Sequence, residues 1–318
     1  MITHFNFAAT PSLFFGEGKL SVLQSVIKTF GSKILLVTGA RSFLNSVHGD
    51  QLLQKLKESG IAVECYRIDR EPTPSLVDAA VDQFSSYAPD CIVAIGGGSA
   101  LDGGKAISAM LPLRTSVKDY LEGVGTKAHP GTKTPFIAIP TTSGTGSEAT
   151  TNAVISETGT NGFKRSLRHY NFVPEIAIVD PLLTLSCSPE TTAASGMDAF
   201  TQLAESYLST AANPLTDALA YEGLRQIATS LKKSFDDGNS LEARTGMALA
   251  SYLSGVTLAN AGLGLVHGFA SPIGGYFEIP HGTICSALMS PANKVTVRKL
   301  RSKKTNPGAL KKYSNMGR

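Results

Sequence analysis

Short apolar runs and amphipathic segments alternate over residues 1–180 of the chain. Three runs, at 33–39, 91–98 and 135–142, are almost continuously apolar, which is typical of strands buried on both faces of a parallel sheet. Segments between the runs place apolar residues at helical spacing, so the pattern predicts right-handed βαβ units in a doubly wound, mostly parallel sheet. The predicted strands are 4–16 at one edge, 33–39, 61–68, 91–98, 135–142 and 175–181, and the predicted helices are 18–30, 48–58, 75–87 and 99–110.

The pattern changes after Pro181. Residues 189–262 contain almost no β-branched runs, and Ala, Leu, Ser and Met recur at spacings of three and four, which predicts helices. The boundary is expected near 180–181, where proline stops the last strand. The sequence therefore predicts an α/β domain over residues 1–181 and an all-α domain over residues 182–318. At least three helices are expected in the second domain, at about 189–211, 214–235 and 240–262.

The composition is that of an ordinary globular chain. It has 318 residues, 42% hydrophobic and 17% charged, which is enough for two domains. It contains no apolar run of about 18 residues, so no membrane span is expected. The N-terminus lacks the basic-then-apolar order of a secretory signal. Cys65, Cys91, Cys187 and Cys285 are far apart and form no CxxC pair, which favours reduced thiols in a cytoplasmic protein.

The net charge of +4 is unevenly distributed. Residues 294–318 hold nine Lys and Arg and no acid, so the rest of the chain carries −5. A uniformly basic surface is therefore not implied, and nucleic acid is not an expected partner. Only the basic tail offers such a surface.

Two glycine-rich segments follow predicted strands: AIGGGSALDGGK (94–105) and PTTSGTGSE (140–148). Glycine lets the backbone approach a phosphate, and the N-terminus of a helix offers free N–H groups. Taken alone, the first segment is explained equally well by a tight strand–helix turn that binds no ligand. The second, taken alone, is more often a Ser/Thr/Gly-rich surface loop. Two of them beyond the carboxyl ends of strands in one sheet favour a bound ligand. The candidate binding residues are Gly96, Gly97, Gly98, Ser99 as a helix cap, Asp102 and Lys105 on the first turns of that helix, Thr141, Thr142 and Thr145.

Oxygen and nitrogen donors collect in the second half of the chain. GMDAFTQLAES (196–206) places Asp198 on a predicted first helical turn, with Gln202 on the same face. His267 and His281 follow in VHGFASPIGGYFEIPHG. Taken singly, the aspartate is explained by the helix dipole and the histidines by core or turn positions. Together, one Asp and two His suit Fe(II) or Zn(II), and we expect no thiolate near them in the sequence.

These motifs, in this order, resemble the iron-containing (group III) alcohol dehydrogenase family over about residues 15–289. The resemblance implies a dinucleotide-binding first domain, a metal-binding helical domain and an active site in the cleft between them. In that family the metal ligands are an aspartate, a histidine four residues later and two further histidines. Asp198, His267 and His281 match and are the expected catalytic ligands, whereas Gln202 stands where a histidine is expected and is kept as a weak fourth ligand. Ser271 also replaces a histidine that many relatives carry.

The resemblance further implies hydride transfer between NAD or NADP and a small alcohol or aldehyde, by a homodimer or larger homo-oligomer. Lys164 resembles the family lysine near the nicotinamide ribose. Gly39 stands where NAD-using relatives often carry aspartate, and Arg41 is close by, so NADP is expected to be accepted. The alternatives are an enzyme similar to maleylacetate reductase, glycerol dehydrogenase or dehydroquinate synthase, or a catalytically weakened nucleotide-binding protein.

Family members usually continue for about 60–80 residues beyond this point, as the resemblance implies. We therefore expect the helical domain to expose apolar surface near the cleft and to be less stable than the first domain. A fragment or a frameshifted end is the alternative explanation of the basic tail.

Overall fold

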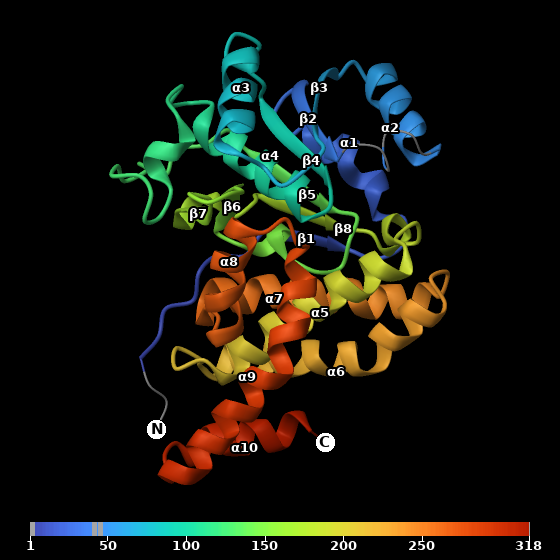
Figure 1. Ribbon diagram of the computed structural model, residues 1–318. Coiled ribbons are helices and arrows are strands. Elements are labelled where there is room, and N and C mark those ends of the chain that lie inside the picture. The colour runs from blue at the N-terminus through green and yellow to red at the C-terminus, as the bar shows by residue number, and fades with distance from the viewer. Residues whose placement is uncertain (1–3, 40–42, 44–46, 318) are drawn as a thin grey trace.

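The computed structural model describes residues 4–39, 43 and 47–317. An α/β part stands above a helical part in Figure 1. Six parallel strands form the main sheet in the order β1-β8-β5-β4-β2-β3, which confirms the doubly wound, mostly parallel architecture. Because β4 and β5 are neighbours, the glycine-rich segments that follow them lie side by side. The strands are β1 (Ser12–Phe15), β2 (Lys33–Gly39), β3 (Ala62–Ile68), β4 (Cys91–Gly96), β5 (Phe136–Pro140) and β8 (Ile176–Val179).

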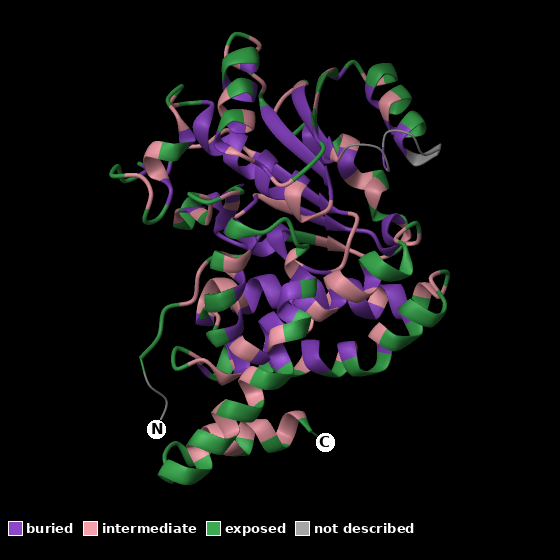
Figure 2. Ribbon diagram, in the orientation of Figure 1, coloured by how far each residue is buried: buried purple, intermediate pink, exposed green. Residues whose placement is uncertain are grey.

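Helices cover both faces of this sheet, and the alternation of strand side chains divides the core between them. Leu35, Ile92 and Phe136 pack with α3 and α4 on one face. Ile34 and Val93, which are next to Leu35 and Ile92 in the sequence, pack with α1 and α2 on the other face. Figure 2 shows the central strands buried between these helical layers. The helices are α1 (Leu23–Ile27), α2 (Val47–Glu58), α3 (Pro74–Phe84) and α4 (Gly98–Met110).

The first predicted elements are too long. Of the edge strand predicted at 4–16, only residues 12–15 form a strand, β1, and this strand does lie at the sheet edge. Residues 4–11, which precede β1, run along the helical part (Figure 1), where the N–H of Ala8 bonds to the side chain of Asn260. The helix predicted at 18–30 is a 3₁₀ turn, Lys19–Val22, followed by the short α1.

Along the chain, an antiparallel hairpin lies between β5 and β8, and the sequence did not predict it. It consists of β6 (Asn152–Glu157) and β7 (Phe163–Arg168), which form a separate two-stranded sheet. Ala153, Ile155 and Leu167 pack into the same core as α3 and α4. The hairpin therefore closes one side of the α/β part, beside the glycine-rich segments.

The second part is entirely helical, as predicted, and its first three helices match the predicted ranges within a few residues. Side-chain caps mark their starts: Ser188 accepts from Thr191, Asn213 forms a capping box, and Ser240 accepts from Ala243. Their apolar faces pack on each other in one core. The helices are α5 (Pro189–Leu208), α6 (Pro214–Asp236), α7 (Leu241–Ala261), α8 (Leu265–Tyr276), α9 (His281–Lys303) and α10 (Pro307–Met316).

A sharp bend separates α7 from α8. Gly262 ends α7 with a φ of 70°, a conformation that glycine adopts without strain, and α8 starts after Gly264. The two helices meet at 100°. Among the described residues, no single helix has the length and apolar character of a membrane span. The bent pair of α7 and α8 would reach that length and apolar character only if its two helices were counted together. Large apolar side chains are exposed on and around α8 and α9: Leu265, Phe269, Tyr276, Phe277, Ile279 and Val295.

Candidate active site

One cavity of about 760 Å³ is lined by residues of both parts of the molecule. The β4–α4 turn and the loop after β5 line one side, and α5, α8 and the start of α9 line the other. Gly96 and Thr141, which were also predicted to bind the coenzyme, are not among its lining residues. The predicted residues that line it are Gly39, Gly97, Gly98, Ser99, Asp102, Thr142, Thr145, Lys164, Asp198, Gln202, His267 and His281.

The glycine-rich turn is packed against the loop after β5. A Cβ on Gly98 would lie 2.5 Å from Cγ2 of Thr145, so only glycine fits there without movement. Gly97 is the N-cap of α4, and no side chain of the described residues caps this helix. Ser99 lies inside the first turn, so the prediction that it caps the helix is wrong. The first N–H groups of α4 therefore face the cavity without a side-chain partner.

The two predicted residues outside the cavity have packing roles. A Cβ on Gly96 would lie 2.6 Å from the Cβ of Ala100. The N–H of Thr141 donates to the carbonyl of Gly96 at 2.9 Å, and the Thr141 carbonyl accepts from the Cys187 thiol at 3.2 Å. Both residues therefore contribute to holding the turn in place.

Asp102 and Lys105 lie on the same helix but differ in role. Asp102 lines the cavity and accepts a hydrogen bond from Ser147 at 2.5 Å, while burial raises the pKa of its carboxyl. The Nζ of Lys105 is buried and donates to the carbonyls of Ser147, Thr150 and Asn152 at 2.7, 3.0 and 2.8 Å. Burial lowers the pKa of this amine to about 8. Lys105 therefore fixes the loop that carries Thr145 and does not line the cavity.

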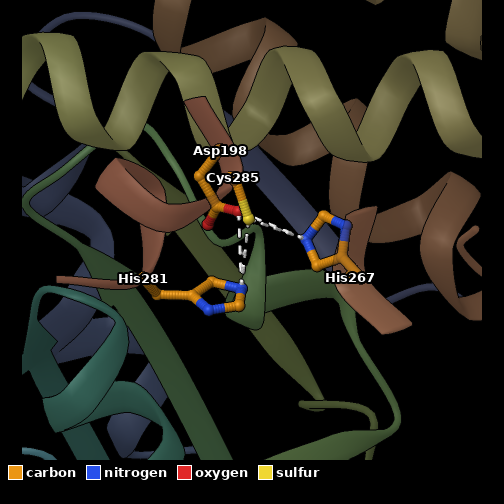
Figure 3. Close-up of side chains that lie close together, drawn as sticks. All are labelled: Asp198, His267, His281 and Cys285. Carbon is orange, nitrogen blue, oxygen red and sulfur yellow. Dashed lines mark hydrogen bonds and ion pairs between the residues drawn. The ribbon is translucent and has the colours of Figure 1, made fainter. Parts of the chain in front are cut away.

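Donor atoms from three helices converge on the other side of the cavity (Figure 3). Asp198 lies in the middle of α5, because that helix begins at Pro189, so the prediction of a first-turn acid is wrong. His267 lies on the first turn of α8, and His281 is the first residue of α9. The Oδ1 atom of Asp198 is 3.4 Å from Nε2 of His267 and 3.8 Å from Nε2 of His281.

A thiol completes this cluster, although none was expected near it. The Sγ atom of Cys285 is 3.7 Å from Nε2 of His267 and 3.7 Å from Nε2 of His281. One ligand atom from each of Asp198, His267, His281 and Cys285 lies within 4.8 Å of the others. The signal was present in the sequence, since Cys285 follows His281 by four residues and shares its helix face.

Gln202 lies one turn after Asp198, but its amide is already engaged. Its Nε2 donates to Oδ2 of Asp198 at 3.2 Å, and its Oε1 accepts from Ser254 at 3.0 Å. The amide oxygen therefore faces α7 instead of the imidazoles.

Glu205, which the sequence analysis missed, orients His267. Its Oε2 lies 2.7 Å from Nδ1 of His267, and its Oε1 accepts the N–H of Val266 at 2.6 Å. Burial opposes the charged form of His267, but hydrogen bonds to Asp198, Cys285 and Glu205 outweigh it and raise the imidazole pKa well above its usual value. Burial lowers the pKa of His281 to about 4.

Lys164 reaches the cavity from β7. Its ammonium pairs with Glu71, and the other oxygen of that carboxylate accepts from Ser156. Only 8% of the Lys164 side chain is exposed. The neighbouring charge of Lys164 lowers the pKa of Glu71, against the effect of burial.

Gly39 ends β2 and also lines the cavity. Among the described residues, no atom lies within 4 Å of a Cβ built at this position. Arg41, on which the expectation for NADP partly rests, lies outside the described residues. That expectation stays a prediction.

A glycine-rich strand–helix turn that faces a buried carboxylate–imidazole cluster across one cavity is typical of enzymes that use a nucleotide coenzyme and a metal ion. Two family models divide this chain between them. The model described as "Iron-containing alcohol dehydrogenase" matches residues 10–181, and the one described as "Fe-containing alcohol dehydrogenase family, C-terminal" matches residues 192–316. The chain belongs to the iron-containing alcohol dehydrogenase family, as its motifs suggested.

Individual relatives agree with this assignment. The chain is 39% identical to long-chain-alcohol dehydrogenase 1 of Geobacillus thermodenitrificans over 86% of its own length and 69% of that protein's. It is 35% identical to the NAD-dependent methanol dehydrogenase of Bacillus methanolicus over 90% and 74% of the two chains. The crystal structure of the archaeal Red Sea brine pool alcohol dehydrogenase ADH/D1 superposes with a TM-score of 0.91 at 27% identity, covering 99% of this chain and 79% of that one.

Proposed function

We propose that this protein transfers a hydride reversibly between a nicotinamide coenzyme and a small alcohol or aldehyde, with a divalent metal ion in the Asp198–His267–His281 cluster. One observation carries the proposal: the glycine-rich turn and the donor cluster line a single cavity. A coenzyme held at the turn and a substrate oxygen held at the cluster would therefore meet in the same space.

The chemistry of the donor set supports a bound Fe(II) or Zn(II). Asp198 is 2% exposed, and its carboxylate shares a buried space with two imidazole nitrogens. A buried carboxylate needs a positive partner, and imidazole nitrogens suit both ions. When bound, such an ion acts as a Lewis acid toward a substrate oxygen.

The chain's own residues supply the remaining functions. Glu205 accepts a hydrogen bond from Nδ1–H of His267 and so turns the Nε2 of that imidazole toward Asp198. The free N–H groups at the start of α4 suit a pyrophosphate, and the hydroxyls of Thr142 and Thr145 lie in the same cavity. Lys164 is held by Glu71 at the cavity wall, where a ribose hydroxyl is a suitable partner.

The coenzyme is proposed to be NADP or NAD. Gly39 offers no carboxylate to repel a 2′-phosphate, which supports NADP. One relative, the methanol dehydrogenase, is named as NAD-dependent.

The test combines metal analysis with turnover. Protein purified without oxygen is assayed for bound metal and for reduction of a panel of aldehydes with NADH and NADPH. We expect about one metal ion per chain, aldehyde-dependent coenzyme oxidation, and loss of both in His281→Ala. The control is His4→Ala, which changes an exposed histidine outside the cavity. Equal metal content in His281→Ala and the parent would refute the cluster, and coenzyme that is never oxidised would refute the reaction.

A further inference from the structure

The donor cluster differs from the ligand set that the resemblance implies, because a thiol lies beside the two imidazoles and position 202 holds a glutamine. We propose that Cys285, and not Gln202, is the fourth protein ligand of the metal, and that the resulting Asp–His–His–Cys site selects zinc over iron(II). This inference rests on the proposed function only in requiring a metal ion in the cluster.

Four of the six distances between the donor atoms are close to those of a tetrahedral site, and the other two are within 4.8 Å. Zinc bonds of about 2.0–2.3 Å to oxygen, nitrogen and sulfur place neighbouring ligand atoms roughly 3.4–3.6 Å apart in a tetrahedron. Here the carboxylate of Asp198 lies 3.4 and 3.8 Å from the two imidazole nitrogens, and the Cys285 sulfur lies 3.7 Å from each of them. These four separations each need adjustments of only a few tenths of an ångström.

Existing hydrogen bonds separate the two candidates for the fourth position. The amide of Gln202 is used on both sides, by Asp198 and by Ser254, so its oxygen would have to leave Ser254 to reach the ion. The thiol of Cys285 has only the imidazoles of His267 and His281 as hydrogen-bond partners within the described parts of the chain. Ligation by sulfur therefore breaks no other contact.

The position of Cys285 on its helix is also favourable. His281 and Cys285 are one turn apart on α9, the spacing at which two side chains of a helix point to the same side. Cys285 is fully buried, in a small core with Val266, Ala270 and Ile284 that joins α8 to α9. The resemblance implies two ligands four residues apart on α5, at positions 198 and 202. In the proposed site, the two ligands four residues apart are instead His281 and Cys285 on α9.

The chemistry of the set decides the metal. Binding releases the thiol proton to solvent, and the thiolate then forms the metal–sulfur bond. A thiolate is a soft ligand that suits zinc, whereas an all-imidazole and carboxylate set suits iron(II) as well. Exchange of an imidazole for a thiolate therefore moves the preference of the site toward zinc.

Cobalt(II) spectroscopy of the full chain tests the sulfur bond directly. The metal-free protein is loaded with one equivalent of cobalt(II), whose bond to a thiolate gives a charge-transfer band in the near ultraviolet. We expect the band in the parent, its loss in Cys285→Ser, and its retention in Cys65→Ser, which changes an exposed thiol on β3. A parent that binds cobalt without the band would overturn the proposal even if Cys285→Ser failed to fold, as would a Cys285→Ser protein that keeps the band.

Zinc binding provides the second measurement. We expect Cys285→Ser to raise the zinc dissociation constant by at least about tenfold, the lower limit seen when even an outer-shell partner is lost. The double variant Gln202→His/Cys285→Ser should recover binding without the cobalt band and take up a larger share of iron(II) from an anaerobic mixture of both ions. An unchanged metal share in that variant would contradict the selectivity. Metal uptake and turnover without the band would refute only the role of Cys285, whereas absence of any bound metal would refute the proposed function itself.

Discussion

Glu205 and His267 form the contact that orients the donor cluster. The carboxylate lies 2.7 Å from Nδ1 of the imidazole and also accepts the N–H of Val266 at the start of α8. A carboxylate at this end of a helix is stabilised by the free N–H groups there. Because the Nδ1 side of His267 is occupied, its Nε2 is the nitrogen that faces Asp198 and Cys285.

Loss of this carboxylate should weaken metal binding more than it weakens the fold. We expect Glu205→Gln to lower zinc affinity by about 10–100-fold, the usual effect of removing an outer-shell partner of a ligating histidine. Calorimetric or competition titration with zinc measures the change. Glu222→Gln, which alters a glutamate on α6 that pairs with Arg225, is the control and should bind as the parent does. Identical affinities in the two variants would show that Glu205 has no part in ligation.

The sequence predicted the sheet well because burial on both faces leaves a local signature. The runs at 33–39 and 135–142 are apolar at nearly every position, and both are central strands. The helices near 189 and 214 were predicted from the spacing of their apolar residues, and the structure adds the caps Ser188 and Asn213 at their starts. The hairpin of β6 and β7 was missed because its strands are partly polar, with Lys164 and Arg165 in β7.

The cluster itself could be predicted only in part. Asp198, His267 and His281 were found through their motifs, whereas Cys285 and Glu205 were not. Helical spacing shows which residues share a face, but which faces of α5, α8 and α9 meet is decided by packing over long sequence separations. Glu205 and His267 are 62 residues apart, and only the fold brings them together.

The close contact between Gly98 and Thr145 predicts a cost for any side chain at the turn. We expect Gly98→Ala to weaken coenzyme binding by at least about tenfold, or about 1.4 kcal/mol, because the new Cβ would displace the threonine from the cavity wall. Thr145→Ser removes the methyl group that lies 2.5 Å away, so the double variant should regain part of the affinity. Fluorescence titration with NADH and NADPH measures both effects. Additive losses in the double variant would argue against the contact as the cause.

Gly39 predicts the coenzyme preference. An aspartate there would accept hydrogen bonds from a ribose and repel a 2′-phosphate, and no atom of the described residues lies within 4 Å of a Cβ at this position. We expect Gly39→Asp to shift the ratio of kcat/KM values toward NAD by about tenfold or more, equal to about 1.4 kcal/mol. Gly39→Asn, which has the same size without the charge, should shift it much less. If both variants keep the parent ratio, position 39 does not face the ribose.

Glu148 follows the second glycine-rich segment and is 1% exposed. Its Oε1 has no hydrogen-bond partner within the described residues. Burial raises the pKa of this carboxyl from 4.5 to about 7, and the nearby charge of Lys105 compensates only partly. Glu148 therefore keeps its proton in the folded protein at pH values where the unfolded chain has lost it.

This difference in proton binding makes stability depend on pH in a defined direction. Below pH 4.5 both the folded and the unfolded state hold the proton, so this group does not make stability depend on pH. As the pH rises from 4.5 toward 7, only the folded state holds the proton, so the free energy of unfolding falls. At about 1.36 kcal/mol per pKa unit, the fall is on the order of 3 kcal/mol. Glu148→Gln mimics the protonated carboxyl and should remove this fall, so its stability relative to the parent should increase between pH 5 and pH 7.5. Urea unfolding at both pH values measures it, and Glu58→Gln, an exposed change on α2, should follow the parent. Parallel pH profiles for Glu148→Gln and the parent would mean that the Glu148 carboxyl is charged in the folded state across this range.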